Sequence, residues 1–372
     1  METKFGRWLK SRSFQYVFFL ILIASVFYVG LRIGNALEWG FGLRLYPAVF
    51  FLFLVLFFSL FSLLARNGSI FICIIKRVAA YFLCFVIYDT LAMLVIDLIS
   101  LFFHIRQEVR AWLIAAAAII AILLLLYGSV HARRLKTVSY SFQWDAQNEK
   151  TRIVLLSDLH IGIFVGISYL QRVVEAVNRQ EPDLIVIAGD LFDGYLPPDE
   201  ALYPLAETFL KLRVKCGVYA VNGNHDPAGT DERFRKFMKD AGIHFLYNDS
   251  AILPRWNIVG RTGIVDMAEH RIPLTDLLQN TDPRKPTIVL DHDPQGIREA
   301  VSCGVDLVLC GHTHKGQFFP MTILTRAANG KRYFYGQDSF GKTHSVISAG
   351  TGFFGLPIRI GTDSEIVVLD SR

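Results

Sequence analysis

The chain of 372 residues is 52% hydrophobic and 19% charged, with 30 phenylalanines and a mean hydropathy of +0.38. This composition excludes a disordered, collagen-like or low-complexity protein, because the apolar surface is enough to offset the entropy lost on ordering. The first 130 residues carry 11 Lys and Arg against 5 Asp and Glu, a net charge of +6, whereas the other 242 carry 27 against 28. Because the basic excess lies beside apolar segments, no nucleic-acid partner is expected.

Four apolar segments near the N-terminus are long enough to cross a hydrocarbon core of about 30 Å, which takes about 20 helical residues. Three hold no charged residue, and the third holds Asp89 and Asp97, acidic groups that are costly in a membrane and usually paired. Buried core helices or a cleavable signal peptide fit this pattern less well. We predict an all-α transmembrane bundle in residues 1–136, with helices at about 14–31, 45–65, 78–103 and 111–130.

The basic residues between these segments predict the orientation, since loops rich in Lys and Arg tend to stay in the cytoplasm. Ten lie on the side of the N-terminus, and four lie on the opposite side. With four spans, both termini and the whole chain after residue 136 are predicted in the cytoplasm, as part of a multi-pass protein of the cell membrane. The five cysteines follow no disulfide or zinc spacing, in agreement with a reducing compartment.

From about residue 150, short β-rich apolar runs alternate with helical stretches, which is typical of a layered α/β domain. We expect a linker at 137–151 and this domain at 152–372. Polar side chains follow each of five candidate strands, at 153–157, 184–188, 218–221, 287–290 and 307–310. Because ligands of α/β sheets bind beyond the carboxyl ends of the strands, we expect these polar groups on one rim.

The groups on this rim are carboxylates, an amide and imidazoles, which suit Mn, Fe, Zn or related divalent ions. A single histidine is more often a surface or core residue than a ligand, but five such motifs in succession favour a metal site. Seven plausible ligands exceed what one tetrahedral ion can use, so two ions are expected. Paired ions suit phosphoryl chemistry, because they bind phosphate oxygens and turn a bridging water into an attacking hydroxide.

The motifs are D-L-H at 158–160, G-D-L-F-D at 189–193, G-N-H-D at 223–226, a later histidine, and G-H-T-H at 311–314. Together and in this order they resemble the calcineurin-like metallophosphoesterase superfamily, over about residues 152–369. Residues 361–368 resemble the last strand of a membrane-attached bacterial branch of that superfamily. The resemblance implies an α/β fold, a four-layer αββα sandwich, here preceded by the transmembrane bundle of four helices.

The resemblance also implies a role for each residue of the motifs. Three would hold the first ion, three would hold the second, and one would bridge both. These are Asp158, His160 and His314 for the first ion, Asn224, His292 and His312 for the second, and Asp190 as the bridge.

Two further residues would act in catalysis rather than as ligands. His225 would protonate the leaving oxygen or stabilise the transition state, and Asp193 would orient its ring. Lys315 stands where membrane-attached relatives often have glycine. It could contact a substrate phosphate, and a solvated loop lysine is the alternative.

The function implied is a membrane-embedded phosphoesterase that hydrolyses a phosphate ester or pyrophosphate bond through a metal-bridging hydroxide. The membrane region favours a lipid-linked substrate, and a UDP-diacyl sugar, cleaved by some bacterial relatives, is the most concrete candidate. Two alternatives stay open: a transporter or sensor with a regulatory metallophosphoesterase-like domain, and an anchored phosphodiesterase acting on soluble substrates. The expected partners are the lipid bilayer, two divalent ions and a phosphate-containing small molecule or lipid.

Overall fold

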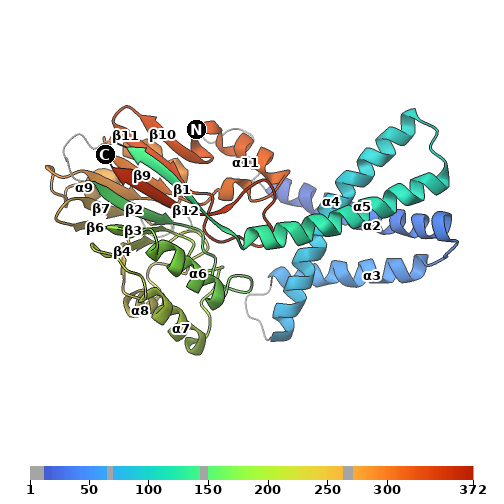
Figure 1. The fold of residues 1–372 in the computed structure, drawn as a ribbon, viewed down its shortest axis with the longest axis horizontal. Helices are drawn as coiled ribbons and strands as arrows, with labels where there is room; N and C mark the ends of the chain where they lie inside the picture. The colour runs from blue at the N-terminus through green and yellow to red at the C-terminus, as the bar shows by residue number, and fades with distance from the viewer. Residues whose placement is uncertain (1–11, 65–69, 143–149, 263–270, 372) are drawn as a thin grey trace. The chain divides into compact units, whose positions relative to one another are not determined.

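The computed structural model describes residues 12–64, 70–142, 150–262 and 271–371. The chain divides into two compact units. Among the described residues, one unit is helical and comprises those between 12 and 130 with 355–358, and the other is an α/β unit of those between 131 and 354 with 359–371. Figure 1 shows the long helices of the first unit and the strands of the second.

The helical unit contains α2 (Arg12–Phe41), α3 (Tyr46–Ser59), the 3-10 segment η1 (Leu60–Leu64), α4 (Ile70–Phe102) and α5 (Gln107–Ala132), whose last two residues belong to the α/β unit. Three of these helices are long and apolar enough to cross a membrane, over Tyr16–Phe41, Phe71–Phe102 and Gln107–Ala132. Each extends past the apolar segment that predicted it, at one end or at both. The chain therefore carries a membrane region, as predicted.

The second predicted span, 45–65, differs from the other three. Its α-helix has 14 residues and continues as five residues of 3-10 helix. At 1.5 and 2.0 Å per residue, the two together are about 31 Å long, which only just matches a hydrocarbon core. The α3 helix is nevertheless packed in the unit, since the ring of Phe53 lies edge-on to Phe82 with centroids 5.6 Å apart.

Asp97 on α4 joins three helices of this unit. Its carboxylate pairs with Arg32 on α2 and with Arg110 on α5, and it accepts a hydrogen bond of 2.7 Å from the hydroxyl of Tyr28. Asp89, by contrast, is fully buried, and neither of its carboxylate oxygens has a hydrogen-bond partner among the described residues. Of the two acidic residues singled out in the sequence, Asp97 is therefore paired with basic side chains, whereas Asp89 is buried without a hydrogen-bond partner among the described residues.

The α/β unit is built on two six-stranded sheets, with strand orders β1-β12-β2-β3-β4-β5 and β10-β11-β9-β8-β7-β6. Within each sheet a central set of strands is parallel, β2 to β5 in the first and β7, β8, β9 and β11 in the second. The strands are β1 (Leu135–Phe142), β2 (Thr151–Leu156), β3 (Leu184–Ala188), β4 (Val218–Val221), β5 (Ile243–Phe245), β6 (Asp249–Ile252), β7 (Asn257–Gly260), β8 (Thr287–Leu290), β9 (Leu307–Cys310), β10 (Gly336–Phe340), β11 (Thr343–Ile347) and β12 (Ser364–Ser371).

Helices cover the outer faces of the two sheets, which gives the predicted αββα order. One apolar core joins the first sheet to α6 (Ile167–Asn178), α7 (Asp199–Phe209) and α8 (Glu232–Asp240), which lie together in Figure 1. A second core, with Trp256 fully buried, lies between the sheets. A third joins the second sheet to α9 (Leu274–Leu278) and α10 (Ile297–Ser302), and α11 (Met321–Asn329) follows β9.

The five predicted strands correspond to β2, β3, β4, β8 and β9. Nearly every residue in them is buried, because both faces of these strands are covered, and a strand covered on both faces is a continuous apolar run. The predicted linker at 137–151 begins inside β1, an edge strand that pairs in parallel with β12. Residues 143–149 of that linker lie outside the described residues.

Candidate metal centre

The residues expected to bind metal lie in loops that follow five buried strands of the two sheets. Asp158 and His160 follow β2, Asp190 follows β3, Asn224 follows β4, and the other three histidines follow β8 and β9. At residues with a side chain, a left-handed backbone costs about 1 to 3 kcal/mol and is typical of functional sites. The angle φ is positive at five of the seven, namely Asp158 (50°), His160 (49°), Asp190 (52°), His312 (72°) and His314 (49°).

Asp158, His160 and His314 form one group, with a ligand atom of each within 4.8 Å of the others. Nε2 of His314 lies 3.3 Å from Oδ1 of Asp158 and 3.1 Å from Nε2 of His160. All three side chains are buried. The structure thus brings together the three residues assigned to the first ion.

Asn224, His292 and His312 also meet. Oδ1 of Asn224 lies 3.1 Å from Nε2 of His292 and 2.8 Å from Nδ1 of His312. Nδ1 of His292 lies 2.7 Å from the carbonyl oxygen of Ala188, to which an Nδ1–H group can donate a hydrogen bond, and this leaves Nε2 as the ligand atom.

Asp190 stands between the two sets. Its Oδ2 lies 3.2 Å from Nε2 of His292 and 3.5 Å from Nε2 of His160. Asp158, Asp190 and His292 form a second group of ligand atoms that lie within 4.8 Å of one another. The role of Asp190 as a bridge between two ions stays a prediction.

The charges in the centre suit a divalent cation. Burial lowers the pKa of His160 to about 3 and that of His314 well below its usual value, so both rings are neutral and offer lone pairs at neutral pH. Burial alone would raise the pKa of Asp190, but the facing His292 and His160 hold it well below the usual range. Burial opposes the charge of His292 too, yet Asp190 raises its pKa to about 10. Carboxylates and lone pairs therefore converge where water is excluded, and the donor set fits metal ions.

Two glycines let the backbone approach these carboxylates closely. A Cβ added at Gly223 would overlap Oδ1 of Asp190, and one added at Gly311 would overlap Oδ2 of Asp158. The glycines of G-N-H-D and G-H-T-H are thus required by close approach. Asp226, the last residue of G-N-H-D, accepts hydrogen bonds of 2.8 Å from the amides of Phe192 and Gly223. It therefore links the loops after β3 and β4.

His225 lies beside the centre without forming part of either ligand group. Its amide donates to Oδ1 of Asp190 at 2.8 Å, and its ring centroid is 5.3 Å from that of His160. Burial lowers the pKa of His225. Oδ1 of Asp193 lies 3.7 Å from Nδ1 of His160, so this carboxylate is near the ligand His160, and its assignment to the His225 ring stays a prediction.

Lys315 follows the second histidine of G-H-T-H, and its ammonium lies over the ring of Tyr335, 4.0 Å from the centroid. The hydroxyl of Tyr335 donates to Glu365 at 2.9 Å. Lys315 therefore has an aromatic partner in the protein, and its contact with substrate phosphate stays a prediction.

Sequence reasoning missed three residues that surround the centre. Phe354 packs its ring on His225, with centroids 4.3 Å apart, and is 41% exposed. Gln317 is buried and holds Phe354 by two hydrogen bonds. Arg359 is fully buried and donates to the backbone around residues 349–352. The turn-forming G-T-G-F-F-G stretch at 350–355 was a usable signal for Phe354, whereas nothing in the local sequence marks Arg359 as buried.

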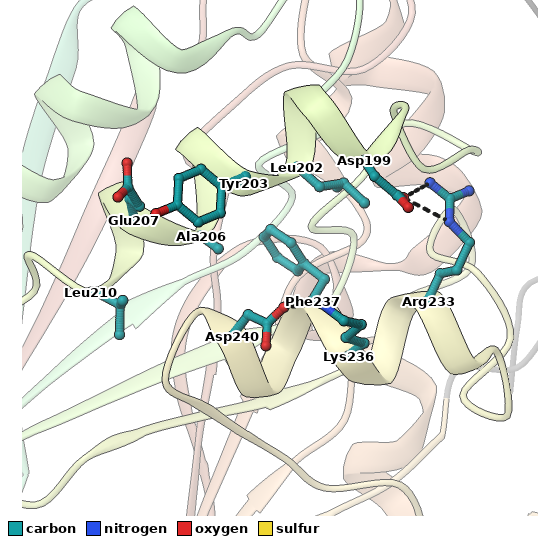
Figure 2. Close-up of a pocket in the computed structure, with 10 residues that line it drawn as sticks. All are labelled: Asp199, Leu202, Tyr203, Ala206, Glu207, Leu210, Arg233, Lys236, Phe237 and Asp240. Atoms are coloured by element: carbon teal, nitrogen blue, oxygen red, sulfur yellow. Dashed lines mark hydrogen bonds and ion pairs between the residues drawn. The ribbon is translucent and has the colours of Figure 1, made fainter.

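A cavity of about 580 Å³ lies elsewhere, between α7 and α8. Figure 2 shows Leu202, Ala206 and Phe237 in it, and the ion pair of Asp199 with Arg233 at one end. None of its lining residues is a candidate ligand. This cavity is therefore not the candidate metal centre, which lies in the loops after the strands.

The sequence matches the family model of the calcineurin-like phosphoesterases over residues 151–316. A transmembrane protein with metallophosphoesterase domain from Danio rerio is 35% identical over 282 residues, which cover 70% of this chain and 62% of that protein. An uncharacterized metallophosphoesterase from Helicobacter pylori is 33% identical over 233 residues, which cover 60% of each chain. The chain thus spans less than two thirds of the length of these two relatives.

Phosphodiesterase YaeI of Escherichia coli is 31% identical over 234 residues. The match covers 59% of this chain and 81% of that protein. It therefore extends over most of a named relative. The chain belongs to the calcineurin-like phosphoesterase family.

Proposed function

We propose that the protein is a membrane-anchored, metal-dependent phosphoesterase. The observation that carries the proposal is the convergence of two carboxylates, an amide and four imidazoles at the facing ends of two sheets. Family membership supports the same reaction class. We infer two ions, one at Asp158, His160 and His314 and one at the remaining set, with Asp190 between them.

Divalent ions, when bound, supply Lewis-acid stabilisation of the phosphate and lower the pKa of water for attack. The side chains of the protein would hold the ions in place and donate a hydrogen bond to the leaving oxygen. His225 is the residue we assign to that task. Because burial lowers its pKa, the neutral ring is the form present at pH 7, and this favours hydrogen-bond donation to the leaving oxygen over a role as imidazolium.

The substrate class is proposed on two grounds. The relative named a phosphodiesterase favours a diester bond as the bond that is cleaved. The candidate membrane spans favour a substrate that resides in the bilayer, such as a phospholipid or a lipid-linked pyrophosphate. A UDP-diacyl sugar remains one specific example to be assayed, on the cytoplasmic side if four segments cross the membrane.

The test is an activity screen of the full-length protein in detergent, supplemented in turn with Mn²⁺, Zn²⁺ and Fe²⁺. Substrates are bis(p-nitrophenyl) phosphate, a phosphomonoester, a nucleotide diester and a lipid pyrophosphate. We expect hydrolysis that a chelator abolishes and metal restores. A purified, folded, metal-loaded protein without activity on any of these would remove the phosphoesterase proposal and favour a regulatory or sensory domain.

A further inference from the structure

We propose that Phe319, Met321, Ile323 and Phe354, here called the apolar rim, bind the surface of an anionic lipid bilayer beside the candidate metal centre. The link to a substrate rests on the proposed function, because a bilayer bound at the rim would present lipid substrates to the site. The proposal that the rim binds a bilayer is argued from four observations: the exposure of these side chains, the hydrogen bonds that hold them, their connection to α5 and the basic residues near them.

The rim exposes large apolar side chains to solvent. The exposed fractions are 49% for Phe319, 38% for Met321, 59% for Ile323 and 41% for Phe354. Three of the four stand on α11 or directly before it, and none of the nine residues of α11 is buried. The exposed side chains of Met321 and Ile323 on this helix can therefore contact another surface.

The two parts of the rim are fastened together. Oε1 of Gln317 accepts from the amide of Phe354 at 2.8 Å, and Nε2 of Gln317 donates to the Phe354 carbonyl at 3.0 Å. Gln317 is two residues before Phe319, and it is buried. The ring of Phe354 also packs on His225 and lies 5.1 Å from the ring of His160. Hydrogen bonds and ring contacts therefore hold the rim beside the candidate metal centre.

The same frame connects the rim to the residues where α5 ends. The amide of Phe319 donates to the carbonyl of Ile360 at 3.0 Å. Three residues farther on, Oδ1 of Asp363 lies 3.0 Å from Nε2 of His131, in the last turn of α5, and its Oδ2 accepts from Lys136 at 3.1 Å. Within the α/β unit, the rim is therefore connected through residues 360–363 to His131, which is in the last turn of the candidate membrane span α5.

The basic residues near the rim favour binding to an anionic bilayer. Residues 312–337 contain Lys315, Arg326, Lys331 and Arg332 and no acidic residue. Asp338 pairs with Arg332, and Glu365 interacts electrostatically with Lys315, so acidic neighbours offset two of the four charges and leave those of Arg326 and Lys331. Basic residues next to exposed apolar side chains are typical of segments that bind in the headgroup region, where anionic lipids attract the cations and the apolar groups enter the acyl boundary.

The experiment is hydrogen–deuterium exchange of the full-length protein in nanodiscs of phosphatidylcholine alone and of phosphatidylcholine with phosphatidylglycerol. We expect amide exchange in α11 to be slower by about tenfold in the anionic discs. Ile323→Asp should abolish that difference. The matched control is Ile252→Asp on β6, where Ile252 is 55% exposed and stands outside the rim, and it should keep the protection.

Equal exchange of α11 in both discs and in detergent overturns the proposal. Protection that appears only when a membrane extract containing other proteins is added assigns the rim to a protein partner instead, and also overturns it. Protection that is equal in both discs but absent in detergent removes the role of charge, and with it the anionic bilayer as occupant.

A kinetic arm separates this inference from the proposed function. Ile323→Asp should lower hydrolysis of a phospholipid in mixed vesicles by roughly tenfold while hydrolysis of bis(p-nitrophenyl) phosphate is unchanged. If the parent protein hydrolyses neither substrate, the proposed function fails and the exchange experiment alone decides on the rim. If both activities fall equally in Ile323→Asp, the residue acts on the centre rather than on lipid, which contradicts the inference.

Discussion

The guanidinium of Arg359 donates to the backbone carbonyl of Gly352, with Nη2 2.7 Å and Nε 3.3 Å from the oxygen. The same fully buried side chain donates to the carbonyl of Ala349 at 2.7 Å and to that of Gly350 at 3.3 Å. The amide of Gly352 in turn donates to the carbonyl of Asp158 at 2.9 Å. Arg359 therefore holds the loop that supports a candidate ligand.

We expect Arg359→Lys to weaken metal binding without unfolding the protein. Lysine keeps the charge but cannot donate to several carbonyls at once, so the 349–352 loop should loosen around Asp158. Loss of such supporting contacts costs about 10- to 100-fold in metal affinity. Isothermal titration with Mn²⁺ measures the change. Arg298→Lys, whose guanidinium lies over Tyr333, is the matched control, and a loss of the same size there contradicts this role for Arg359.

For Asp190→Asn we expect metal content to fall and hydrolysis to be lost while the fold is retained. The amide keeps an oxygen able to accept from the amide of His225, but it no longer neutralises two ions. Metal analysis, activity and far-ultraviolet circular dichroism check these points. Asp240→Asn, a neutralised surface carboxylate on α8, serves as control. Full activity in the Asp190 variant would mean that no bridging carboxylate is needed.

His225→Ala should give a different result, because this residue is assigned to the leaving oxygen and not to a metal. Metal content should persist while kcat falls by roughly 10²- to 10⁴-fold. The decrease should shrink for substrates with a good leaving group, which need little help. A variant that has lost its metal would show that His225 is a ligand or supports one.

Metal affinity should rise with pH between about 7 and 9. In the metal-free protein the neighbouring Asp190 raises the pKa of His292 to about 10, so His292 is protonated at neutral pH and must lose that proton to bind an ion. Each pH unit below that pKa therefore costs about tenfold in apparent affinity. Titrations in buffers of different ionisation enthalpy should also detect the released proton. An affinity independent of pH over this range contradicts the prediction.

The number of crossings is tested by reporter fusions after Arg372 and in the loop at Gly42, which follows α2. If α3 with η1 crosses, four spans place both termini in the cytoplasm, and a cytoplasmic reporter after Arg372 is active. If it does not cross, three spans place the C-terminus on the side opposite the N-terminus. A C-terminal reporter active only outside would remove cytoplasmic nucleotide-linked lipids from the candidate substrates.

The central strands of the α/β unit were predictable because both of their faces are buried. Leu184–Ala188 and Leu307–Cys310, for instance, are unbroken apolar runs, and no other element of that length requires such a run. The edge strands were not predictable by the same rule. In β10 (Gly336–Phe340) no residue is buried, so its sequence carries no apolar signal, and its pairing with β11 depends on tertiary context.

The motifs at the strand ends predicted which ligand residues come together, since chain order and sheet geometry fix where loops after parallel strands meet. The support around the ligands did not follow from local sequence. Arg359 is separated from His314 by 45 residues, and a buried arginine that donates to carbonyls resembles any surface arginine in the sequence. The same holds for Gln317 and Phe354, whose pairing depends on a close approach of two loops.

The division of the candidate ligands between the two sheets sets an order of assembly during synthesis. Asp158, His160, Asp190 and Asn224 belong to loops of the first sheet, whereas His292, His312 and His314 belong to loops of the second, about 70 to 90 residues after Asn224. A nascent chain that stops before His292 holds Asp190 without the imidazole that faces it. If the proposed ions bind, we expect metal loading to follow synthesis of the second sheet, and a chain truncated within that sheet should have an incomplete ligand set.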